Sequence, residues 1–123
     1  MERRIIKYCM IGLVILTSCY YDNEEKLYPA TNCASTAMSL SADITPILER
    51  NCYSCHSVGA GPLNGNITLE GYGELMKHVQ SGALLGAIKH QYGFSAMPKN
   101  ASQLGSCETA KIEKWIADGA LNN

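Results

Sequence analysis

Cys52-Tyr53-Ser54-Cys55-His56 is the stretch around which this chain is organised. Two cysteines three positions apart, with a histidine directly after the second, match the C-x-x-C-H pattern of covalent haem attachment. The spacing has a chemical reason, because two thiols on one tight turn can each add across a vinyl group on the same edge of the macrocycle. The histidine is then carried under the ring, where its imidazole can ligate the iron. The pattern therefore predicts one covalent haem c, attached through Cys52 and Cys55, with His56 as its proximal ligand.

Residues 1–18 have the layout of a bacterial lipoprotein signal peptide. A basic start is followed by an uncharged apolar run over residues 8–16 and by small residues before a cysteine. This run is far shorter than the roughly 20 residues that span a bilayer, so we expect no transmembrane helix. The Leu-Thr-Ser-Cys at positions 16–19 resembles a lipobox, which implies cleavage before Cys19 and acylation of its thiol. An ordinary signal peptide with a chance cysteine is the alternative.

Residues 19–40 are predicted to form a flexible acidic tether, because they are polar and show no hydrophobic periodicity. Acyl chains on Cys19 would hold the protein on a bacterial membrane, at the periplasmic face or the cell surface. The acidic residues soon after Cys19 resemble the surface-export signal of lipoproteins in the Bacteroidetes group, whereas a solvated spacer is the plainer interpretation.

The charge of the chain gives no indication of nucleic-acid binding. The whole sequence has a net charge of −1, and the leader carries +2, so the chain from Cys19 has a net charge of −3. A nucleic-acid-binding domain would need a basic face.

The six cysteines divide without remainder. Cys9 leaves with the leader, Cys19 takes lipid, and two belong to the haem motif. Cys33 and Cys107 remain, and export to an oxidising compartment favours a disulfide between them. Two free buried thiols are the alternative.

Apolar residues recur at helical spacing in four segments of the folded domain, which is predicted to cover residues 41–123. The segments are residues 43–51, 72–80, 83–90 and about 106–119. Residues 57–66 and 91–105 are rich in turn residues and have no period, so we expect loops there. The domain is therefore predicted to be all-α. At this size a protein core alone is marginal, and a haem would supply the missing apolar surface.

Taken together, these features resemble a class I monohaem cytochrome c. The resemblance rests on the haem motif, a Gly-Pro-Leu at positions 61–63, Met97 followed by proline, and a terminal helix with a tryptophan. It implies a small class I cytochrome c-like domain of three to four helices wrapped round one haem. It also implies that Met97 is the distal ligand and that the Pro62 carbonyl accepts the Nδ1–H of His56.

The residues themselves also favour Met97. A thioether is a soft, neutral ligand that raises the reduction potential of haem iron. Pro98 restricts the preceding residue to extended geometry and so stiffens the segment. Met38 falls in the predicted tether, and Met76 lies on a helical face with other apolar residues.

Two histidines compete with Met97 for the sixth position on the iron. His90 would give bis-histidine ligation and a lower potential, and His78 is a weaker candidate because it follows a lysine. Cys52 and Cys55 with these two histidines could instead supply four zinc ligands, but the histidines are twelve positions apart, unlike those of a zinc finger. A thioredoxin-like Cys-x-x-Cys would need a preceding strand, and none is predicted.

The expected function follows from these ligands. A haem iron with two protein ligands leaves no open position, so we expect a membrane-anchored carrier of single electrons between redox protein partners. We expect no enzyme activity and no small-molecule substrate. Tyr92, Phe94 and Trp115 are expected to wall the haem crevice. A haem-containing sensory or accessory module and a haem-free surface lipoprotein are the alternatives.

Overall fold

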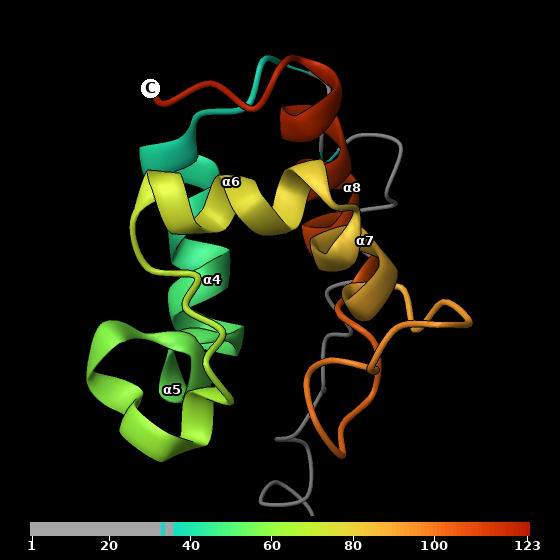
Figure 1. Ribbon diagram of the computed structural model, residues 1–123. Coiled ribbons are helices and arrows are strands. Elements are labelled where there is room, and N and C mark those ends of the chain that lie inside the picture. Colours follow the sequence, from blue (N-terminus) through green and yellow to red (C-terminus); the bar gives the residue numbers. More distant parts are fainter. Residues whose placement is uncertain (1–32, 34–35) are drawn as a thin grey trace, which may run out of the picture.

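The computed structural model describes Cys33 and residues 36–123, and this part of the chain forms helices and turns with no strand (Figure 1). Its elements in chain order are η2 (Leu40–Ile44), α4 (Thr45–Asn51), α5 (Tyr53–His56), η3 (Val58–Asn64), α6 (Tyr72–Gln80), α7 (Ala83–Ile88) and α8 (Ser106–Ala117). The all-α class predicted from the sequence is confirmed for these residues.

The helix positions follow the hydrophobic periodicity closely. Helix α6 has the predicted bounds, and α8 begins where expected and ends before Gly119, which has a φ of +99°. Helix α7 ends two residues earlier than predicted, and His90 beyond it has a left-handed φ of +49°. The predicted first helix is divided into a π-helical turn, η2, and helix α4, which has Pro46 in its first turn.

The core lies where η2, α4, α6, α7 and α8 meet. Trp115 of α8 has no exposed surface, and its indole N–H donates to the carbonyl of Leu121 at 3.0 Å. The hydroxyl of Tyr72 on α6 donates to the carbonyl of Ala120 at 3.1 Å and so ties α6 to the chain that leaves α8. The buried apolar residues are Met38, Ile44, Ile47, Leu48, Leu69, Leu75, Leu84, Ile88, Leu104, Ile112, Trp115 and Ala120.

The packed part of the chain begins before residue 41, which corrects the predicted tether boundary. Met38 is only 5% exposed and belongs to the core, although the sequence placed it in the tether. Asn123 then fixes the start of η2. Its main-chain oxygen accepts from the Ser39 hydroxyl and the Ser41 N–H, both at 2.9 Å, and its side-chain oxygen accepts from the Leu40 N–H at 2.9 Å. The two ends of the packed segment are thus joined.

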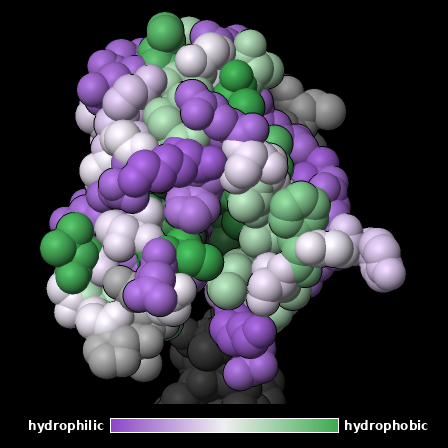
Figure 2. Space-filling view, in the orientation of Figure 1, coloured by the Kyte–Doolittle hydropathy of each residue, from purple (hydrophilic) through white to green (hydrophobic). Residues whose placement is uncertain are grey.

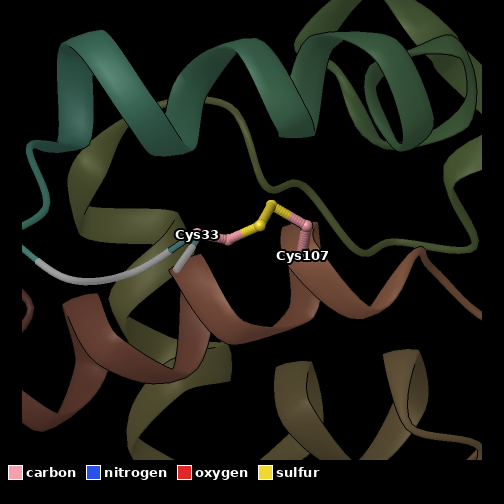
Figure 3. The surroundings of a disulfide bond; sticks show 2 residues. All are labelled: Cys33 and Cys107. Atoms are coloured by element: carbon pink, nitrogen blue, oxygen red, sulfur yellow. A yellow bond between two sulfur atoms is a disulfide. The ribbon is translucent and has the colours of Figure 1, made fainter. Parts of the chain in front are cut away.

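The disulfide predicted from the cysteine count is present. Cys33 and Cys107 are bonded with their Cα atoms 5.4 Å apart, and Figure 3 shows the bridge leaving the first turn of α8. Next to Cys107, the Glu108 carboxylate accepts from Arg50 and Asn51 at the end of α4, both at 3.2 Å. Helix α8 is therefore fixed both to α4 and to the chain before the domain.

Candidate functional site

The two thiols of the C-x-x-C-H motif lie on one helical turn that continues from α4. The N–H groups of Cys55 and His56 both donate to the carbonyl of Cys52, at 3.1 and 2.9 Å, and the Cys52 N–H donates to Leu48 at the end of α4. Cys52 and Cys55 are both free cysteines. The chain thus presents two thiols one turn apart that form no disulfide, as attachment to one edge of a macrocycle requires.

The two thiols differ in their surroundings. Cys52 is half-buried against the core, whereas Cys55 is exposed. Burial raises the pKa of the Cys52 thiol to about 11, and the nearby Glu108 carboxylate adds to this shift. Cys52 therefore stays protonated at neutral pH.

The imidazole of His56 is held by the chain that follows it. Its Nδ1 donates to the carbonyl oxygen of Ile67 at 3.1 Å, and its own carbonyl accepts from the Leu69 N–H at 2.8 Å. A third bond, from the Val58 N–H to the Glu70 carboxylate at 2.8 Å, closes the same loop. A carbonyl only accepts, so the neutral ring carries its proton on Nδ1 and keeps the lone pair of Nε2 for a metal.

The expected role of the Pro62 carbonyl falls to another residue in this structure. Pro62 lies in η3. The Nδ1 of His56 bonds instead to the carbonyl oxygen of Ile67, eleven residues after the histidine. The predicted loop over 57–66 is mostly the 3₁₀ element η3, with a kink at Gly61, where φ is +56° and ψ is −130°. Beyond it, the returning chain passes beside the imidazole at Ile67. Sequence reasoning missed Ile67 because it contributes a main-chain oxygen, which no side-chain pattern marks.

Met97 lies in the loop after α7, and both polar groups of its main chain are bonded. Its N–H donates to the carbonyl of Ala87 on α7 at 3.1 Å, and its carbonyl accepts from the Nε2 of His90 at 3.0 Å. The two rivals for the sixth ligand position are therefore neighbours. The Nε2 of His90 carries a proton and donates a hydrogen bond to the Met97 carbonyl, so this nitrogen has no lone pair free for a metal.

The three aromatic residues expected to wall a crevice do not form one wall. Trp115 is enclosed in the core, and Tyr92 is fully exposed at 105%. Phe94 is 41% exposed, and its ring covers Gly86 on α7, where an added Cβ would lie 2.3 Å from Phe94 Cδ2. The expectation that Tyr92 and Trp115 wall a crevice is thus corrected, because Tyr92 faces solvent and Trp115 is buried in the core. Gly86 is needed for this approach of Phe94, although in the sequence it only weakened the helical pattern.

The motif and the Met97 loop lie at the same end of the molecule. In Figure 1, α5 and η3 form one side of the lower end and the loop after α7 forms the other. The space-filling view in Figure 2 shows a recess between these two sides, with hydrophobic residues around it. In and next to these segments, Val58 is 73% exposed, Ile67 and Phe94 are less exposed, and Tyr92 is fully exposed.

The zinc ligand set is not assembled. Within Cys33 and residues 36–123, no three histidine, cysteine or acidic side chains form a group that could hold a metal ion. His78 lies on α6, and His90 bonds to Met97. A haem iron, in contrast, takes only one or two side chains from the protein.

Neither the models of known protein families, nor the curated proteins, nor the solved structures include a match to this chain. In the described part of the chain, no helix has the length and apolar character needed to cross a membrane. The lipidation site predicted at Cys19 lies outside the described residues. The chemistry of the site is therefore the basis for a function.

Proposed function

We propose that this protein is a membrane-anchored monohaem c-type cytochrome that carries single electrons between redox protein partners. The observation that carries the proposal is the hydrogen bonding of the His56 ring. Its Nδ1 is bonded to Ile67, so Nε2 has a free lone pair, directly after two free thiols on the same turn. A donor bond at the far nitrogen is what orients and tunes a metal-binding histidine.

The donor set of the chain fits a haem c. Cys52 and Cys55 would hold it through thioethers, His56 would bind the iron from one side, and Met97 would bind it from the other. A bound haem supplies a reversible one-electron change at its iron. The chain's own part is to fix the imidazole, to present the thioether from a bonded loop and to surround the ring with apolar side chains. Two protein ligands leave no iron position for a substrate, which favours a carrier over an enzyme.

The arrangement of the helices supports the finer proposal of a class I cytochrome c-like fold. The recess in Figure 2 lies between the motif and the Met97 loop, where a flat apolar group would be gripped from two sides. The core that holds these two sides apart is built from α4, α6, α7 and α8.

The proposed location is the surface of a bacterial membrane, through an acylated Cys19. The Cys33–Cys107 disulfide supports it, because disulfides persist outside the cytoplasm and are rare inside it. The periplasmic face and the cell surface both meet this condition.

Haem staining and visible spectra test the proposal. The full chain is produced with a c-type maturation system, and we expect covalent haem, a low-spin reduced spectrum and a sulfur-to-iron charge-transfer band in the oxidised form. Cys52→Ala and Cys55→Ala should each weaken attachment, and together they should abolish it. Met97→Leu should remove the charge-transfer band, whereas the matched control Met76→Leu, in a helix that packs on the core, should keep it. A wild-type chain without covalent haem would contradict the proposal. High-spin iron that binds carbon monoxide readily would contradict the carrier function.

A further inference from the structure

We propose that His90 is a positioning residue that holds Met97 in place to ligate iron, and is not itself a ligand. The inference rests on the proposed function, because it assigns a role toward the iron–sulfur bond expected there. His90 lies two residues after the end of α7, and Met97 lies seven residues later, at the other end of the same loop. We call residues 90–97 the ligand loop.

The ligand loop is closed at its neck by bonds to one helix end. The carbonyl of Ala87 accepts from the N–H of His90 and from the N–H of Met97, both at 3.1 Å. The Nε2 of His90 then donates to the Met97 carbonyl at 3.0 Å, in partly buried surroundings. With its N–H and its carbonyl both bonded, the Met97 main chain is fixed relative to α7. Its side chain is therefore presented from a defined point.

The body of the loop is held to the same helix by packing. The Gln91 N–H donates to the carbonyl of Gly86 at 2.9 Å, and the Phe94 ring covers Gly86. Of all these attachments, only the bond from His90 to Met97 is made by a side-chain donor. It is the one contact at the neck that a substitution can remove without changing the backbone path.

The backbone at His90 explains why this residue type suits the position. Its φ is +49°, in the left-handed region, which histidine enters several-fold more often than most residues. The same turn that ends α7 points the ring back toward Met97. Ligation of iron by His90 through Nε2 would require this nitrogen to lose its proton and leave the Met97 carbonyl, so Nε2 cannot serve both partners.

The test is competition by imidazole for the oxidised iron of the haem-loaded full chain. Imidazole can replace Met97 only when the ligand loop moves the methionine sulfur away from the iron. The apparent dissociation constant of imidazole therefore reports how stably the loop keeps Met97 on the iron. His90→Phe keeps a ring but removes the donor, and we expect it to lower this constant about fivefold, which corresponds to ~1 kcal/mol, the usual net value of one hydrogen bond. The charge-transfer band should weaken at the same time.

Two further variants separate positioning from general stability. His90→Gln places an N–H near the position of Nε2 and shares with His90→Phe the cost of a left-handed backbone, so it should restore the wild-type imidazole constant. His78→Gln, on α6, removes a histidine away from the ligand loop and should leave the constant and the band unchanged.

The outcomes are distinct. If the wild type has the charge-transfer band and His90→Phe leaves both the band and the imidazole constant unchanged, His90 does not position Met97. If wild-type haem is low-spin without the band and His90→Phe makes it high-spin, His90 is the ligand and the inference is overturned while covalent haem remains. If no variant or wild type carries covalent haem, the proposed function fails and the inference with it.

Discussion

Gly86→Ala tests how the ligand loop is seated on α7. The added Cβ would lie 2.3 Å from Cδ2, 2.5 Å from Cγ and 2.6 Å from Cε2 of Phe94, whereas carbon atoms in contact are about 3.5–4.0 Å apart. The ring must therefore move by roughly 1 Å. Because Cγ is near the main chain, the loop must move with the ring. Overpacking of this kind costs about 1–3 kcal/mol, and alanine in place of glycine inside a helix returns about 1 kcal/mol.

We therefore expect Gly86→Ala to lower the free energy of unfolding by about 1 kcal/mol in the wild type. In a Phe94→Ala background the clash is absent, and the same substitution should stabilise by up to about 1 kcal/mol. Urea unfolding of the four proteins, followed by the fluorescence of the buried Trp115, measures both values and their coupling. If Gly86→Ala has the same effect with and without the Phe94 ring, the ring does not rest on Gly86.

Two further predictions concern the cysteines. Replacing Cys33 and Cys107 by serine should lower the free energy of unfolding by ~4 kcal/mol, because the bridge joins residues 74 positions apart and restricts the unfolded chain; a loss below about 1 kcal/mol in urea unfolding would refute this account of its role. Burial raises the pKa of Cys52 to about 11 from an ordinary value of 9.0. Between about pH 9 and pH 11 the thiol therefore ionises in the unfolded chain but not in the folded one, so the free energy of unfolding of the haem-free chain should fall over this range. The part of this pH dependence that is due to Cys52 should be absent from Cys52→Ala, and an identical pH profile in both proteins would speak against it.

The helices were predictable because each buries one face. Periodicity placed α6 at its observed bounds and α8 at its observed start. Helix ends depend on local backbone geometry, and the left-handed turn at His90 ended α7 earlier than its apolar pattern suggested.

Met38 was missed because nothing periodic surrounds it. A flexible, unbranched side chain can fill a gap in a core wherever the chain passes, and here its segment is held in place by Asn123 from the far end of the domain. Such a long-range contact leaves no trace in the local sequence.

The haem motif and the methionine loop were visible in the sequence, but their supports were not. Main-chain atoms of Ile67 and Ala87 accept the bonds that hold His56 and Met97, and a main-chain acceptor can belong to any residue. The proline expected to orient His56 was chosen by analogy, and the kinked path through Gly61 brings a later residue to the ring instead. The sequence thus marks the side chains that are proposed to carry the chemistry, but not the backbone atoms that orient them.

Hydrogen bonds between Asn123 and residues 39–41 close the segment 39–123 into a ring that lacks only a covalent link between its ends. In such a ring the order of the helices along the chain and their order in space are separable. A short linker across this junction, with new ends opened at the fully exposed Tyr92, would give a circular permutant with the same core. Its new ends would interrupt the segment between His90 and Met97. Such a permutant would show whether the bond from His90 to Met97 requires a continuous chain between the two residues, or only that both are held by α7.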